Sequence, residues 1–235
     1  MNSLPEVTII NLGLVDYKEA WDIQENYFRQ AIDRKIAIRN GENLAPPSNY
    51  LILCEHPHVY TIGKSGNKEN LLLSENEVAS KEASFYKINR GGDITYHGPG
   101  QLVVYPILDL EQFFTDIHKY MRFLEEAVIN TLLKFNIQSS RIDGMTGVWL
   151  DSDLPTARKI CAMGVKSSRW VTMHGIGFNI NTNLDFFSHI VPCGIDDKAV
   201  TSMQKELGRK IDIKEVEAII LEEFKSLFGF IVKEN

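Results

Sequence analysis

The sequence predicts an α/β fold of the α+β type, in which a mixed, largely antiparallel sheet is flanked by helices. Its strand patterns follow one another with short polar connections, and its long helical patterns fall between sets of strands. A doubly wound parallel sheet would require a helix after nearly every strand. With 235 residues, of which 44% are hydrophobic, the chain can bury one large core. Because no repeat or linker interrupts it, residues 1–235 are expected to form a single domain.

The first predicted elements are a helix over 17–38 and a strand over 50–54. Asp16 is placed to cap the helix, whose apolar residues form a stripe, and Asn40-Gly41 ends it. The strand is short and apolar, and His56-Pro57-His58 closes it. The two histidines have no carboxylate or thiol set at a known ligand spacing, so no metal site is expected.

The remaining elements follow from the same periodicities. Apolar residues recur at helical spacing near 114–135 and again over 213–228, which predicts two further amphipathic helices. Short apolar runs rich in branched residues predict strands. These runs are 85–89, 102–108, 148–150, 159–165 and 176–181.

A glycine-rich segment, Arg90 to Gln101, precedes the strand over 102–108. Four glycines and a proline give it a freedom of backbone that lets a ligand approach the main chain closely. Its glycines match neither the GxxxxGK[ST] nor the GxGxxG spacing, so a nucleotide phosphate is not its predicted ligand. Arg90, Thr95, Tyr96, His97 and Gln101 supply polar groups. The segment is therefore interpreted as a binding loop for a polar carrier group or a carbonyl oxygen.

Composition and charge exclude several classes of protein. The net charge is −6 and no run of Lys or Arg occurs, which argues against a nucleic-acid binder. No window of about 18 apolar residues exists, and the first residues do not resemble a signal peptide, so no membrane association and a cytoplasmic location are expected. Three cysteines are too few for a disulfide framework and fit a reducing compartment.

Cys193 is the candidate nucleophile, because Pro192 and Gly194 place it in a turn. Cys54 and Cys161 end or interrupt apolar runs and are expected in the core. A thiol of ordinary pKa, about 8.5, is mostly protonated at neutral pH, so Cys193 needs a cationic neighbour or a base. Spacing alone does not choose among the candidates. These are Lys159, Lys166, His97, His174 and His189.

Four separated motifs together resemble the lipoyl(octanoyl) transferase family, with matching order and spacing from about Tyr50 to Gln204. The motifs are RGGDITYHGPGQ over 90–101, KICAMG over 159–164, HGIGFNIN over 174–181 and PCG over 192–194. The resemblance implies a single catalytic domain, with the fold of biotin and lipoate protein ligases. It also implies an enzyme that moves an octanoyl or lipoyl group from acyl carrier protein, through a cysteine thioester, onto a lysine of lipoyl domains. The implied acceptors are the lipoyl domains of 2-oxoacid dehydrogenase complexes and the glycine cleavage H protein, and no cofactor is implied.

The resemblance also assigns roles to residues. The family pairs a strand lysine with a loop cysteine 34 positions later, which falls on Lys159 and Cys193 and leaves Lys166 an ordinary surface residue. Lys159 would lower the pKa of the thiol and act as acid and base. Backbone N–H groups near Gly164 or Gly175 are expected to stabilise the oxyanion. The implied acyl-binding residues are Arg90, Gly91, Gly92, Asp93, Ile94, Thr95, Tyr96, His97, Ala162, Met163, Gly164, Gly175, Ile176 and Gly177.

Several alternatives stay open at this point. His97 and His174 are equally compatible with a structural role and with proton transfer. Asp93 stands where the family often carries glutamine or another polar residue, and it adds a negative charge to the loop. ATP-dependent ligases share the fold and do not need Cys193. A non-catalytic module that holds acylated proteins, and a thioesterase, are the other readings, and the joint presence of Lys159 and Cys193 disfavours the module.

Overall fold

A large sheet runs through the molecule in the order β12-β1-β2-β6-β10-β9-β8-β7, with β11 beside β9, and a small sheet has the order β4-β3-β5. The computed structural model describes residues 4–191 and 199–233. The strands are β1 Glu6–Leu14, β2 Asn49–Glu55, β3 Val59–Ile62, β4 Ser84–Lys87, β5 Ile94–His97, β6 Gln101–Ile107, β7 Ser140–Ile142, β8 Met145–Leu150, β9 Arg158–Ser168, β10 Val171–Asn179, β11 Ala199–Val200 and β12 Ile231–Val232. The helices are α1 Tyr17–Arg39, α2 Glu75–Ser80, α3 Ile117–Lys134, α4 Met203–Leu207 and α5 Ile213–Phe228.

The predicted mixed, largely antiparallel sheet is confirmed. From β2 to β7 every neighbouring pair of strands is antiparallel. The pairs β12–β1, β1–β2 and β11–β9 are parallel. The central strands β6 and β10 are buried along their whole length, because helices cover both faces of the sheet at this point.

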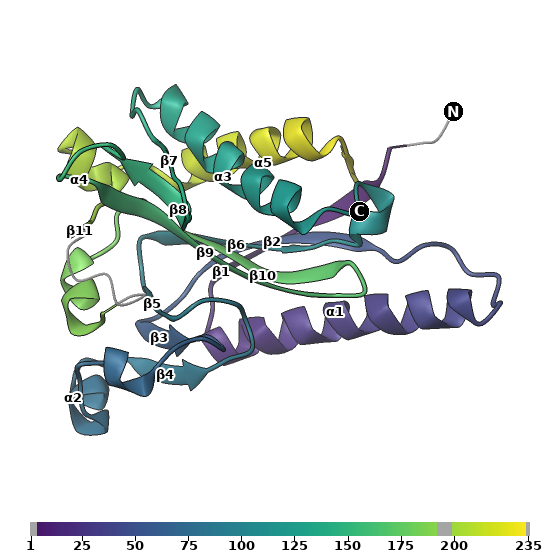
Figure 1. Ribbon diagram of the computed structural model, residues 1–235, viewed down its shortest axis with the longest axis horizontal. Coiled ribbons are helices and arrows are strands. Elements are labelled where there is room, and N and C mark those ends of the chain that lie inside the picture. Colours follow the sequence, from purple (N-terminus) through teal and green to yellow (C-terminus); the bar gives the residue numbers. More distant parts are fainter. Residues whose placement is uncertain (1–3, 192–198, 234–235) are drawn as a thin grey trace.

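Helix α1 covers one face of the sheet, as the sequence predicts (Figure 1). The Asp16 carboxylate accepts hydrogen bonds from the N–H groups of Lys18 and Glu19, which caps the helix. Phe28 and Ala31 pack against apolar side chains of β2, β6 and β10. The N-terminal end of α1 lies beside the small sheet, where Tyr17 packs against Val59. Helix α1 therefore packs against both sheets.

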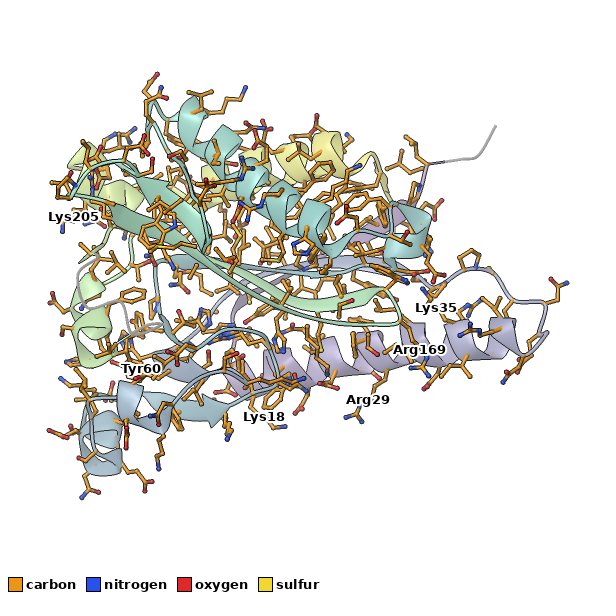
Figure 2. All side chains as sticks on the ribbon, in the orientation of Figure 1. Lys18, Arg29, Lys35, Tyr60, Arg169 and Lys205 are labelled. Carbon is orange, nitrogen blue, oxygen red and sulfur yellow. The ribbon has the colours of Figure 1, made fainter. Side chains whose placement is uncertain are left out.

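Helices α3 and α5 cover the opposite face and enclose the main core (Figure 1). The predicted bounds of α5 agree with its observed bounds, and α3 begins at Ile117 instead of near Phe114 because Asp116 caps it. The β9–β10 hairpin extends beyond this core toward the C-terminal half of α1. Figure 2 shows Arg169, in the hairpin turn, on the same side of the molecule as Lys35 of α1, and both residues line one surface groove.

The glycine-rich segment is not one continuous loop, and this part of the prediction is wrong. Ile94 to His97 form β5, which pairs with β3 in the small sheet. Two turns flank this strand, and they contain Gly92 and Gly100, both with positive φ. Strand β1 and the small sheet as a unit were also not predicted. None of the described helices combines the length and the apolar composition that a membrane-spanning segment requires.

Candidate active site

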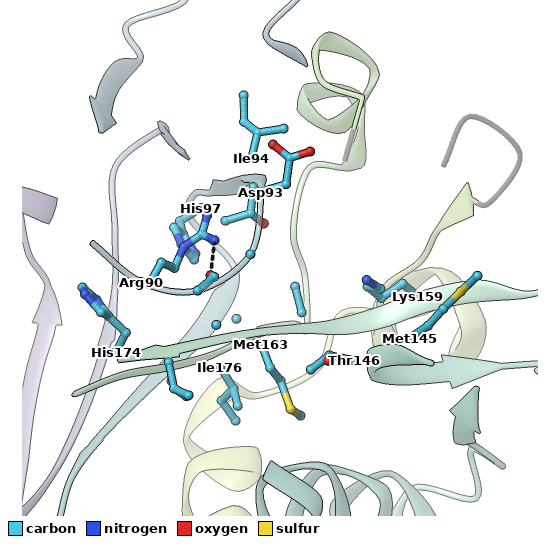
Figure 3. Close-up of a pocket in the computed structure, with 18 of the residues that line it drawn as sticks. Arg90, Asp93, Ile94, His97, Met145, Thr146, Lys159, Met163, His174 and Ile176 are labelled. Carbon is cyan, nitrogen blue, oxygen red and sulfur yellow. Dashed lines mark hydrogen bonds between the residues drawn. The ribbon is translucent and has the colours of Figure 1, made fainter. Parts of the chain in front are cut away.

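A cavity of about 410 Å³ lies between the glycine-rich segment and the β9–β10 hairpin. Its wall contains residues from the three predicted acyl-binding segments together with Lys159. Figure 3 shows Lys159 at one end of the cavity, His174 at the other, and Met163 and Ile176 between them. The fold thus gathers residues that lie up to 183 positions apart, from Tyr17 to Val200, into one wall.

Backbone and side-chain bonds fix the glycine-rich segment over the cavity. The Arg90 guanidinium donates to the carbonyl oxygen of Thr61 (2.9 Å) and to its hydroxyl oxygen (3.1 Å), which ties the segment to β3. The Gly91 N–H donates to the Val165 carbonyl (2.9 Å), which ties it to β9. Asp93, the departure noted in the sequence, accepts from the Asn70 amide at 2.6 Å. The segment is therefore held in place by both sheets.

Tyr96 is the one predicted acyl-binding residue that does not line the cavity. It is fully buried on the other side of β5, in the core of the small sheet, where its hydroxyl contacts His58 Nδ1 at 2.7 Å. Side chains alternate along a strand, so Thr95 and His97 face the cavity while Tyr96 faces away. The sequence prediction treated the segment as a loop and missed this alternation.

His97 is held by a chain of buried amides. Its Nδ1 lies 2.6 Å from Gln101 Oε1, and the Gln101 amide donates to Asn179 Oδ1 at 2.9 Å. Because the Gln101 amide nitrogen donates to Asn179, its Oε1 is left as the acceptor, so His97 Nδ1 donates and Nε2 keeps a lone pair. Burial lowers the pKa of His97 to about 3. These contacts favour a structural, hydrogen-bonding role for His97 over proton transfer.

His174 has a similar environment at the far end of the cavity. Its backbone N–H donates to Gln24 Oε1 of α1 (3.0 Å). Its ring Nε2 lies 3.2 Å from Asn89 Oδ1. Burial lowers its pKa to about 3, and nearby Arg90 and Lys166 act in the same direction. At that pKa the imidazole is neutral at physiological pH, so His174 also fits a structural role.

Lys166 is not the ordinary surface residue that the sequence predicts. Its ammonium forms an ion pair with Glu25 of α1 at 3.0 Å and lies 4.5 Å from the centre of the Phe28 ring. Its side chain is only 19% exposed. Lys166 therefore joins β9 to α1. His189, a third histidine considered from the sequence, contacts the Tyr60 hydroxyl and does not line the cavity.

Lys159 lies on β9, where it opens the predicted apolar strand. Its carbonyl oxygen accepts from the Thr201 N–H (2.9 Å), and its ammonium lies 4.5 Å from the centre of the Trp149 ring. The side chain lines the cavity and is partly buried. The sequence left open whether this lysine is drawn into the protein or faces water at a sheet edge, and the structure places it against the cavity.

The edge of β9 is open to the cavity at Met163. The carbonyl groups of Lys159 and Val165 point away from β10, because they accept from Thr201 and Gly91. Since backbone groups alternate in direction along an antiparallel strand, Met163 also directs its N–H away from β10. The β8–β9 ladder ends at Val148 and Cys161. Gly164 and its partner Gly175 instead turn their N–H groups into the β9–β10 ladder.

Of the three cysteines, two are described by the structure. Cys54 and Cys161 are buried in the core, as predicted, and burial raises the pKa of both thiols. Cys193, the predicted nucleophile, lies outside the described residues. Within 4–191 and 199–233, no group of three or more His, Cys, Asp or Glu side chains is arranged to hold a metal ion.

Sequence reasoning missed several residues of the cavity wall. They include Tyr17, Tyr105, Met121, Thr146 and Trp149, which come from α1, β6, α3 and β8. Most of them fit an amphipathic or strand pattern and were therefore indistinguishable from core residues.

Comparison with known proteins decides the family. Residues 16–225 match the lipoyl protein ligase A/B catalytic domain. The chain is 60% identical over 224 residues to an octanoyltransferase of Christiangramia forsetii, covering 95% of this chain and 96% of that relative. It is 56% identical over 230 residues to an octanoyltransferase of Cytophaga hutchinsonii, covering 97% and 94%. The chain belongs to the lipoyl(octanoyl) transferase family.

Membership of the lipoyl(octanoyl) transferase family makes the chain an acyltransferase, as the sequence resemblance implied. A lipoate protein ligase of Thermoplasma acidophilum, solved with bound lipoic acid, superposes with a TM-score of 0.68 at 15% identity, covering 98% of this chain and 89% of that one. At this identity the likeness shows the fold alone. The predicted fold relation between this transferase and the lipoate ligases is therefore confirmed.

Proposed function

We propose that the enzyme transfers an octanoyl group from acyl carrier protein to a lysine of a lipoyl domain, through a thioester on Cys193. The observation that carries the proposal is the cavity with Lys159 at one end and the three predicted acyl-binding segments along its wall. Octanoyltransferase relatives that span nearly the whole chain support the acyl group. The acceptors we propose are the lipoyl domains of 2-oxoacid dehydrogenases and the glycine cleavage H protein.

In the first half of the reaction, the Cys193 thiolate attacks the carbonyl carbon of the donor thioester. The new Sγ–carbon bond replaces the bond to the carrier's thiol, and the Lys159 ammonium donates a proton to the departing thiolate. One thioester replaces another, so the step is nearly neutral in free energy. ATP is therefore not needed.

In the second half, the amine of the acceptor lysine attacks the acyl-enzyme. An amide forms, Cys193 Sγ departs as thiolate, and neutral Lys159 accepts the proton of the amine and returns to its ammonium form. Forming an amide from a thioester is downhill. The same lysine thus acts once as an acid and once as a base.

Each half passes through a tetrahedral intermediate whose oxyanion needs a fixed donor. We assign this role to the Met163 N–H, because the β8–β9 ladder ends before it and the neighbouring Gly164 N–H is used within the sheet. Removing one oxyanion donor typically costs about 10²–10³ in rate. The sequence indicated backbone N–H groups near Gly164 or Gly175 as donors, and this assignment selects the Met163 N–H among them.

Incubation with octanoyl-acyl carrier protein without ATP tests the proposal. The intact mass of the enzyme should increase by one octanoyl group, and Cys193→Ser should abolish this increase. Lys159→Ala should slow acylation, whereas Lys205→Ala, at an exposed lysine on α4, should not. Added lipoyl domain should then gain the octanoyl group.

Three results would contradict the proposal. An unmodified wild-type enzyme, or a strict requirement for ATP, would favour a ligase that activates the acid as an adenylate. Release of free octanoate with an unmodified lipoyl domain would favour a thioesterase.

A further inference from the structure

The slot that holds Lys159 is built from elements that the sequence did not connect with the site. Trp149 of β8 lies directly opposite Lys159 of β9, beside a shift in register between Val148 and Trp149. The Lys159 ammonium lies 4.5 Å from the centre of the Trp149 ring. This distance falls within the range in which a cation is attracted to an aromatic face, and tryptophan attracts it most strongly.

Trp149 is held there at a cost. It is 2% exposed, and its indole N–H is buried without a hydrogen-bond partner among the described residues. A buried polar group without a partner is unfavourable, and phenylalanine would fill much of the same space without one. The stronger attraction of the indole face for a cation explains why tryptophan occupies this position.

Gly147 lies beside the stem of Lys159, and the Cys161 backbone and its own conformation require a glycine there. A Cβ at position 147 would lie 3.4 Å from Lys159 Cε, 3.5 Å from its Cδ and only 2.6 Å from the Cys161 carbonyl oxygen. The φ of Gly147 is +122°, a conformation that other residues rarely adopt. A glycine is therefore required where the lysine stem passes over β8.

Glu125 of α3 fixes this glycine. Its fully buried carboxylate accepts from the Gly147 N–H at 3.1 Å. The same carboxylate is paired with Arg122 and Arg141, each at 2.8 Å. Helix α3 thus holds the start of β8 in the position that turns Trp149 toward Lys159.

We propose that Trp149 is a positioning residue that holds the Lys159 ammonium in its charged form and in its place, within a slot that Gly147 borders and Glu125 anchors. The proposal rests on the proposed catalytic role of Lys159. The aromatic face stabilises the ammonium and not the neutral amine. At high pH, Lys159 loses its proton and acylation fails. Removing the ring should therefore lower the pH at which this loss occurs.

Other titratable groups near this slot do not account for the same effect. In the described residues these are Glu125, which is paired with two arginines, and Cys161, whose pKa is raised by burial. Arg158 of β9 and Glu206 of α4 form an ion pair with each other at 2.6 Å. None of the hydrogen bonds and ion pairs that these groups form involves Trp149.

The test measures the rate of Cys193 acylation by octanoyl-acyl carrier protein between pH 6 and 10. Trp149→Leu should slow acylation about tenfold and move the alkaline limb of the pH–rate profile down by about one pH unit, which corresponds to about 1.4 kcal/mol. Trp149→Phe should give an intermediate shift, because phenylalanine attracts cations less strongly. The control is Trp170→Leu, which replaces a 38% exposed tryptophan in the hairpin turn and should leave both quantities unchanged.

An unchanged alkaline limb in a folded Trp149→Leu variant would overturn the inference, as would a uniform loss of rate without a shift. If Trp149→Leu does not fold, the Trp149→Phe profile decides in the same way. Failure of the wild-type enzyme to become acylated would instead refute the proposed function, so the two failures are distinguishable.

Discussion

Gly175→Ala tests whether this glycine serves sheet packing or an open space for the acyl group. A Cβ at position 175 would lie 2.0 Å from the Val104 carbonyl oxygen and 2.8 Å from Pro106 Cδ. Both contacts belong to β6, a strand buried along its whole length. The absent side chain at 175 is therefore explained by the close approach of β6.

The geometry sets the size of the effect. An ordinary contact begins at 3.4 Å, so the Cβ and the carbonyl oxygen must separate by 3.4 − 2.0 = 1.4 Å. A shift of this size between adjacent strands breaks hydrogen bonds of normal length, about 2.9 Å. Overpacking costs about 1–3 kcal/mol, and each broken hydrogen bond adds about 0.5–1.5 kcal/mol. The free energy of unfolding should thus fall by about 3 kcal/mol or more.

Thermal unfolding followed by circular dichroism measures this loss. For a chain of this size, about 3 kcal/mol corresponds to a decrease in Tm of roughly 6–12 °C. The matched control is Gly91→Ala, whose Cβ would meet only the Val165 carbonyl oxygen at an ordinary 3.4 Å, and its Tm should stay near that of wild type. A Gly175→Ala variant that melts within 2 °C (~0.5–1 kcal/mol) of wild type would refute the packing explanation.

Two further predictions concern titratable groups. Alkylation of the native enzyme at pH 8 should label one fast thiol that is lost in Cys193→Ser, because burial raises the pKa of Cys54 and Cys161; fast labelling of the Ser variant would contradict this. By NMR, His97 and His174 should remain neutral from pH 8 to 5, since burial lowers both pKa values to about 3. The unfolded state binds protons on both below about pH 6.5, so each histidine should lower stability as the pH falls from there toward 3. A titration near pH 6.5 would show that burial does not control either group.

The helices were predictable because local signals set their limits. Asp16 caps α1 in the structure as its sequence position indicates, and α5 ends at Gly229, whose φ is +66°. The periodicity of α5 continues unbroken between Asp212 and that glycine. Capping side chains and helical spacing act within a few residues, so sequence alone carries them.

Strand partners depend on distant segments, and here the sequence prediction was incomplete. Strand β1 was missed although its pattern is apolar, because only pairing with β2 and β12 defines it. Tyr96 was placed in the site because nothing local shows that β5 pairs with β3. Lys166 looked exposed because its partner, Glu25, lies 141 positions away. In each case the deciding contact is long-range.

The cavity and the lysine slot both depend on one irregularity in the sheet. Strand β8 pairs with β9 at Trp149 and Lys159, its register shifts between Trp149 and Val148, and the ladder ends at the pair of Val148 and Cys161. A regular ladder would continue to Met163 and occupy its N–H, and Gly147 would then have no reason to adopt a φ of +122°. Because β8 departs instead, the Met163 edge opens to the cavity while Trp149 remains against Lys159. The same break in the β8–β9 ladder therefore exposes the Met163 N–H, the proposed oxyanion donor. It also leaves Trp149 beside Lys159, which we propose to be the acid and base.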